Sequence, residues 1–206
     1  MPFISEESAY QIVKPYLGDL LGIVREAWSD WLRNPVAAQM QHPRTRAEIV
    51  WNQMVSHAKR RFDGDPRVKV QPVKFWQGIL IDGKVFIRMK KAEKSLLSRN
   101  YPTPSAFAFN DQENDLFDGV SRLEVVYVLS EDEADLERVV LVQRHQKKIT
   151  WALSLVSDDD QSSQEVLPFA PIAPLSGDVA QRVIKRKKGQ AEKDGTQDKS
   201  AMGGEV

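Results

Sequence analysis

The feature that most restricts the fold of this chain is an Asp-Gly pair set between two apolar runs. Residues 79–87 read Ile-Leu-Ile-Asp-Gly-Lys-Val-Phe-Ile. An Asp-Gly pair adopts the positive φ angles of a type I′ turn, whose twist matches that of two antiparallel strands. The segment therefore predicts a β-hairpin with a two-residue loop, in which Ile79 faces Phe86. This register predicts two faces, one with Leu80, Val85 and Ile87, and the other with Ile79, Phe86, Arg88 and Lys90.

Apolar residues recur at helical spacing before this hairpin. Residues 1–35 predict helix that Pro15 kinks or divides, and residues 45–62 predict a second helix. The second helix is expected to begin at a capping box, in which the side chains of Thr45 and Glu48 satisfy free backbone N–H groups.

The next segments alternate between apolar and polar residues, which predicts an antiparallel sheet over residues 68–156. The strand expected over 68–76 contains Pro72, which lacks an N–H donor, so we place it at a sheet edge. Further strands are expected to form a meander over 122–129, 136–143 and 149–156. The chain is thus expected to be an α+β protein, with N-terminal helices packed on an antiparallel β-sheet built of hairpins and a meander.

The composition changes towards the C-terminus. We expect residues 1–175 to form one domain that ends in an extended, proline-rich strap over 168–174. Residues 176–206 are expected to form a short basic helix and a disordered tail, because the last part of the chain holds few bulky apolar side chains.

Composition also excludes several classes of protein. The chain has no cysteine, which excludes disulfides, Cys-ligated zinc and thiol nucleophiles. It has no apolar run near the 18 residues of a membrane helix, and its N-terminus does not resemble a secretory signal. We therefore expect a cytoplasmic protein that has no membrane partner.

No motif predicts a catalytic residue, a metal site or a cofactor. The histidines at positions 42, 57 and 145 are not paired at helical spacing with another ligand type. The glycine-rich phosphate-binding loops and the Gly-x-Ser-x-Gly motif of serine hydrolases are absent.

One enzymatic alternative is a magnesium-dependent nuclease toxin of the restriction-enzyme type. Such enzymes hold the metal with a helix Glu and strand acids, and they use a Lys to steady the attacking water. Glu48, Asp82 and Lys90 occur in that order. Arg88 stands where the acid before the lysine belongs, so one metal ligand is missing, and Asp82 is explained by the turn.

Charge is balanced overall but uneven along the chain. The formal net charge is +0, yet basic groups dominate residues 59–99 and acidic groups dominate residues 111–137. Cations contact phosphates and aromatic faces stack on unpaired bases, so a basic and aromatic surface predicts binding of nucleic acid or another polyanion. Its candidate residues are Lys84, Phe86, Arg88, Lys90, Lys91, Arg99 and Tyr101.

Two structural explanations of the same residues remain open. The basic and acidic segments can face each other, or the lysines can protect an edge strand from aggregation while the aromatic residues form core.

Two nearby runs carry a resemblance to a known family. They read Leu-Ile-Asp-Gly-Lys-Val-Phe-Ile-Arg-Met-Lys-Lys over residues 80–91 and Leu-Ser-Arg-Asn-Tyr-Pro-Thr over residues 97–103, and a Trp-containing strand follows over 149–153. In these motifs the chain resembles a family of small uncharacterised bacterial proteins over roughly residues 45–155. The resemblance implies a gene beside those of helix-turn-helix proteins with an ImmA/IrrE-type metallopeptidase domain, as in toxin–antitoxin or phage-defence modules.

We therefore expect a non-metalloenzyme component of a two-gene bacterial stress, phage-defence or toxin–antitoxin-like module. Its expected partner is the protein encoded by the neighbouring gene, with nucleic acid as a second candidate. The acidic segment 111–137 is a candidate docking site for a basic partner. A structural or adaptor domain without a ligand is the remaining alternative.

Overall fold

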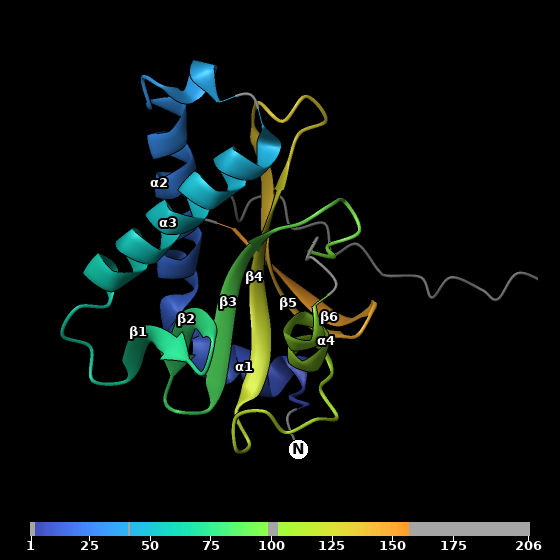
Figure 1. Cartoon of the computed structure of the whole chain (residues 1–206). Helices are drawn as coiled ribbons and strands as arrows, with labels where there is room; N and C mark the ends of the chain where they lie inside the picture. The colour runs from blue at the N-terminus through green and yellow to red at the C-terminus, as the bar shows by residue number, and fades with distance from the viewer. Residues whose placement is uncertain (1–2, 41, 99–102, 157–206) are drawn as a thin grey trace, which may run out of the picture. The chain divides into compact units, whose positions relative to one another are not determined.

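The fold is described from a computed structural model, and the description covers residues 3–40, 42–98 and 103–156. Three N-terminal helices precede a six-stranded sheet, and a fourth helix interrupts the strands (Figure 1). The α+β class is confirmed. The strap, basic helix and tail predicted after residue 156, and the domain boundary at 175, lie outside the described residues.

The elements are α1 (Glu6–Val13), η1 (Lys14–Tyr16), α2 (Leu17–Leu32), η2 (Ala37–Gln39), α3 (Pro43–Arg61), β1 (Val68–Val73), β2 (Trp76–Ile81), β3 (Val85–Lys91), α4 (Pro104–Asn110), β4 (Ser121–Leu129), β5 (Leu136–His145) and β6 (Lys148–Leu155).

The strands lie in the sheet in chain order, from β1 to β6. All neighbouring pairs are antiparallel except β3 and β4, which are parallel. The prediction of a wholly antiparallel sheet is therefore wrong at this pair. A parallel pair needs a long crossover, and the connection between Lys91 and Ser121, which contains α4, supplies it.

The N-terminal helices cover one face of the sheet and α4 covers the other (Figure 1). Apolar side chains of α1, α2 and α3 form one core with the inward-facing residues of the strands, among them Ile79, Ile87, Val125 and Leu141. None of the helices in the described ranges is both long enough and apolar enough to cross a membrane.

The Asp-Gly hairpin forms, but its register differs by one residue from the prediction. Asp82 and Gly83 have φ angles of 50° and 66°, whereas Lys84 becomes a third loop residue, because Ile81 pairs with Val85. This register places Ile79 on the face of the sheet that the N-terminal helices cover, in the main core. Since one face of a strand must bury its apolar residues, the hydrophobic pattern decided the register.

Three local expectations about the chain can be compared with the fold. A 3₁₀ turn at Pro15 divides the first helical segment as predicted, and Pro72 lies on the edge strand β1. The predicted capping box is wrong. Helix α3 begins two residues earlier at Pro43, where the His42 side chain accepts a hydrogen bond from the backbone N–H of Arg44, while Glu48 pairs with the Arg44 side chain.

Candidate anion-binding site

The face of the sheet under α4 carries buried charged residues where a sheet usually carries apolar ones. Arg88 on β3, Arg122 and Glu124 on β4, and Arg144 on β5 are each between 1% and 8% exposed. They alternate with the apolar residues that face the N-terminal helices, so the two-residue period of the strands places them together. Helix α4 and Ser98 bring further polar groups to this face.

Glu124 is the centre of this layer. Its carboxylate forms an ion pair with Arg88 and accepts a hydrogen bond of 3.0 Å from the Ser98 hydroxyl. Arg144 donates to that hydroxyl at 3.1 Å, and its Nη1 lies 3.9 Å from the Glu124 carboxylate. The guanidinium of Arg88 also stacks on Phe109 of α4, with its carbon 3.5 Å from the ring centroid. One carboxylate therefore faces two arginines.

Lys90 adds a third cation to the same face. Burial lowers the pKa of its ammonium group, and the charge of Arg88 lowers this pKa further, while Glu124 opposes the shift. Within the described ranges, no hydrogen bond or ion pair satisfies this ammonium. Burial likewise lowers the pKa of Arg144, and Arg88 contributes to that shift. Among the described residues, the layer around Glu124 thus holds more positive than negative charge, which is costly without a compensating anion.

Arg122 has a different role, because its guanidinium donates its hydrogen bonds to backbone carbonyls. It donates hydrogen bonds to the carbonyls of Ala108, Asp111 and Asn114, at 3.0, 2.7 and 2.7 Å. Those carbonyls lie at the end of α4 and in the loop after it, where helices leave carbonyls unsatisfied. Arg122 therefore positions α4 against the sheet.

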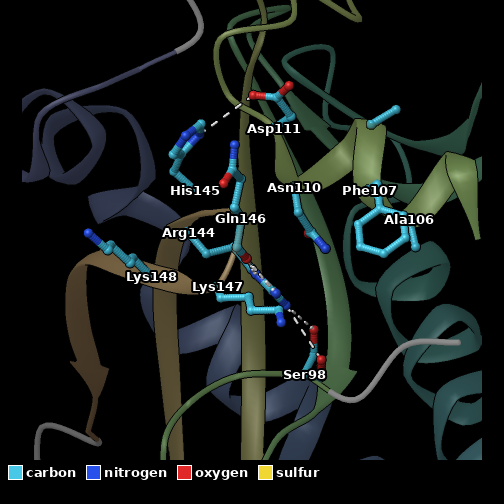
Figure 2. A pocket seen from close by; sticks show the side chains of 11 residues that line it. Ser98, Ala106, Phe107, Asn110, Asp111, Arg144, His145, Gln146, Lys147 and Lys148 are labelled. Carbon is cyan, nitrogen blue, oxygen red and sulfur yellow. Dashed lines mark hydrogen bonds and ion pairs between the residues drawn. The ribbon is translucent and has the colours of Figure 1, made fainter. Parts of the chain in front are cut away.

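A pocket of about 810 Å³ opens beside the charged layer. In Figure 2, the Phe107 ring and the Asn110 amide lie on one side, and Arg144 and Lys147 lie on the other. The backbone N–H of Gln146, in the β5–β6 turn, donates to the Asn110 carbonyl at 2.7 Å and joins the two walls. The lining residues are Ser98, Ala106, Phe107, Ala108, Asn110, Asp111 and Arg144, with residues 145–148.

Asn110 carries an unsatisfied acceptor in the pocket wall. The residue is 7% exposed, and its side-chain Oδ1 is buried with no hydrogen-bond partner in the described part of the chain. A buried acceptor without a donor costs about 1–3 kcal/mol. A ligand that supplies an N–H or O–H group would remove this cost if the Asn110 side chain turned this oxygen towards the pocket.

The pocket is also positively charged. Among the described lining residues, Arg144, Lys147 and Lys148 stand against one carboxylate, that of Asp111. Lys147 and Lys148 are exposed, and neither has an ion pair with another described residue. In Figure 2, the Arg144 guanidinium points towards Ser98, whereas Lys148 points away from it. The charge on this surface favours an anionic ligand.

Asp111, Glu113 and His145 place three ligand-type atoms within 4.8 Å of one another at the pocket edge. Two of these three side chains already accept hydrogen bonds from backbone N–H groups of the loop after α4. Asp111 accepts a hydrogen bond from the N–H of Glu113, and Nδ1 of His145 accepts one from the N–H of Gln112. These contacts explain the cluster, so we assign no metal to it.

The five described residues of the seven predicted to bind a polyanion do not form one surface. Phe86 is fully buried and Arg88 lies in the ion pair with Glu124, so neither is presented at the surface. Lys90 is half-buried on the same face, and Lys84 is exposed in the hairpin loop. Lys91 points to the other face, where it pairs with Glu133. Arg99 and Tyr101 lie outside the described residues.

Basic and acidic segments do meet in the fold. The ion pair of Arg88 with Glu124 and that of Lys91 with Glu133 join the basic segment 59–99 to the acidic segment 111–137. Part of the charge of these two segments is therefore compensated by ion pairs within the protein.

The three residues considered for a nuclease are not brought together. Glu48 is exposed on α3 and pairs with Arg44. Asp82, in the hairpin loop, pairs with Arg67, which comes just before β1. Lys90 lies on the face of the sheet opposite to α3.

Sequence reasoning missed the residues of the pocket. Asn110 and Phe107 lie on α4, a short helix between the predicted hairpin and the predicted meander, where no helix is predicted from the sequence. The basic turn over 144–148 was visible as Arg-His-Gln-Lys-Lys, and it was the one signal that could have indicated this site.

Comparison of the chain with protein-family models, with curated proteins and with solved structures finds no match. The candidate site therefore rests on the geometry described above.

Proposed function

We propose that this chain is a binding protein for an anionic, phosphate-bearing ligand, which it holds in the pocket between α4 and the β5–β6 turn. The observation that carries the proposal is the excess of positive charge around Glu124. Arg88, Lys90 and Arg144 lie near this one buried carboxylate. A bound anion would compensate the excess, as buried charges in proteins are paired.

The position of the pocket supports this proposal. Arg144 belongs both to the charged layer and to the pocket wall, so an anion in the pocket lies close to the excess charge. Lys147 and Lys148 would add attraction at the entrance, where they are exposed and can reorient towards a ligand.

Inorganic tripolyphosphate is a suitable probe, and Lys147→Glu combined with Lys148→Glu is the variant to test. We expect wild-type protein to bind tripolyphosphate and to melt at a higher temperature in its presence, since a ligand of the native state stabilises it. The double variant should bind at least about tenfold more weakly, because two attractive charges become repulsive. Isothermal titration calorimetry and thermal melts measure both effects.

The matched control is Lys59→Glu combined with Lys69→Glu. These lysines are exposed on α3 and β1, away from the pocket, and the control changes the net charge by the same amount. Equal weakening in both double variants would show that binding depends only on overall charge, and it would contradict the proposed site. Absence of binding in the wild type would also contradict it.

The role in a two-gene stress, phage-defence or toxin–antitoxin-like module remains a separate proposal. It rests on the motifs at 80–91 and 97–103, and the pocket does not identify the partner protein. The expected result is growth inhibition when either this chain or the product of its neighbouring gene is expressed alone, with relief on co-expression. Normal growth in all combinations would contradict a toxin–antitoxin role.

A further inference from the structure

We infer that the pocket receives an unpaired nucleotide, with its base against Phe107 and Asn110 and its phosphate towards the basic β5–β6 turn. This inference rests on the proposed function and names the class of its ligand. It uses three features of the pocket that a simple phosphate site does not need: an exposed aromatic ring, a buried acceptor without a donor, and a large volume.

Phe107 is an aromatic side chain that the core does not use. It is 60% exposed and lines the pocket, whereas Phe109, two residues later, is 1% exposed and packs on Phe86 and Trp76. An exposed ring beside cations is typical of sites that bind single-stranded nucleic acids, because every base can stack on it.

Asn110 supplies the polar group that a base edge requires. Its Oδ1 is buried, faces no donor in the described structure, and belongs to a residue that lines the pocket. The inference requires a rotation of the Asn110 side chain that brings this oxygen to the pocket surface. Adenine, cytosine and guanine carry amino groups, and uracil and thymine carry a ring N–H, so any base can then donate to it. An inorganic polyphosphate at neutral pH carries few such donors and leaves the acceptor unsatisfied.

The size of the pocket agrees with a ligand larger than a phosphate group. Its volume of about 810 Å³ lies in the range of small-molecule sites, about 300–1,000 Å³. The apolar side chains of Ala106, Phe107 and Ala108 lie on the α4 wall, and the cations lie on the other. This division matches a nucleotide, which has a flat, largely apolar base at one end and an anion at the other.

The ligand must present its base outside a double helix. In duplex nucleic acid the faces of the bases are stacked on each other and are not available to an aromatic side chain. The inference therefore predicts preference for single strands over duplex of the same sequence. A free nucleoside monophosphate and a nucleotide within a strand share this chemistry, and the experiment distinguishes the two.

The test compares Phe107→Leu with Phe75→Leu in fluorescence anisotropy titrations with labelled single-stranded oligonucleotides. Both replacements remove an exposed aromatic ring, and Phe75, which is 88% exposed at the β1–β2 turn, does not line the pocket. We expect Phe107→Leu to weaken oligonucleotide binding by about tenfold or more, through the loss of stacking. Phe75→Leu should bind as the wild type does, and both variants should bind tripolyphosphate as the wild type does.

Asn110→Asp provides a second readout. A carboxylate at this position repels phosphate but still accepts from a base, so binding of tripolyphosphate should fall more than binding of the oligonucleotide. Since Asn110 is buried, thermal melts of this variant must first show a cooperative transition. If it does not fold, the Phe107 and Phe75 pair decides the matter.

The outcomes separate the inference from the proposed function. Tripolyphosphate binding that needs Lys147 and Lys148, together with oligonucleotide binding that is unaffected by Phe107→Leu, would overturn the inference and leave the proposed function standing. Equal affinity for duplex and single strand would also overturn it. No binding of either probe would overturn both. Competition by nucleoside monophosphate at millimolar concentration indicates a free nucleotide, and its absence alongside oligonucleotide binding indicates a strand; either result supports the inference.

Discussion

Replacement of Glu124 by Gln is expected to lower the free energy of unfolding by about 3–5 kcal/mol. Glu124 is 1% exposed, forms an ion pair with Arg88, and accepts a hydrogen bond from Ser98. Gln has nearly the same shape but no charge, so the variant leaves the buried Arg88 and Arg144, and the half-buried Lys90 beside them, without their carboxylate. Removal of one partner of a buried ion pair is much more costly than replacement of both.

Urea denaturation at neutral pH, followed by tryptophan fluorescence and circular dichroism, measures this effect. The matched control is Glu137→Gln on β5, which removes an exposed carboxylate and should change stability by less than about 0.5 kcal/mol. A loss below about 1 kcal/mol for Glu124→Gln would contradict the assignment of Glu124 as the anion that holds this layer together.

Replacement of Gly78 by Ala is expected to destabilise the protein by about 3 kcal/mol, through overpacking of the β2–β3 pair. A Cβ at this position would lie 2.5 Å from the carbonyl oxygen of Ile87 and 2.6 Å from the ring of Phe86. Both neighbours are fully buried, and one of them is backbone, so relief requires movement of strand β3 and not only a new rotamer. The ring of Phe86 fills the space that a side chain would take, as aromatic residues do beside strand glycines.

The control for this prediction is Gly18→Ala on α2. Apart from its chain neighbours and the backbone of its own helix, no described atom lies within 4 Å of the Cβ position there, and Ala is more favourable than Gly within a helix by about 0.5–1 kcal/mol. Thermal and urea unfolding should therefore show opposite signs for the two Gly→Ala replacements. Wild-type stability of Gly78→Ala would contradict the close packing of Phe86 on β2.

The turn of the hairpin could be predicted from a few consecutive residues, but its register could not. Asp82 and Gly83 predicted the turn correctly, because positive φ angles are a local requirement. The register depended on which residues the helices buried, and it shifted by one residue so that Ile79 and Ile81 entered the main core. Phe86, Arg88 and Lys90 still share a face, since they lie on one strand with a period of two.

The candidate site was much harder to predict than the fold class. Phe86, Arg88 and Lys90 were expected on an exposed surface, and the structure places α4 over the first two. The pocket is built from α4 and the β5–β6 turn, which are more than 30 residues apart in the chain. No spacing rule relates two such segments.

The sequence by itself determined the α+β class, the break at Pro15, the edge position of β1 and the Asp-Gly turn. Each of these follows from the backbone preferences of a few consecutive residues or from the period of the apolar pattern. Only the tertiary structure decided the parallel pairing of β3 with β4, the burial of Arg88 with Glu124, and the meeting of Asn110 with the basic turn. A two-residue period shows which side chains share a face, but what covers that face depends on the path of a distant segment.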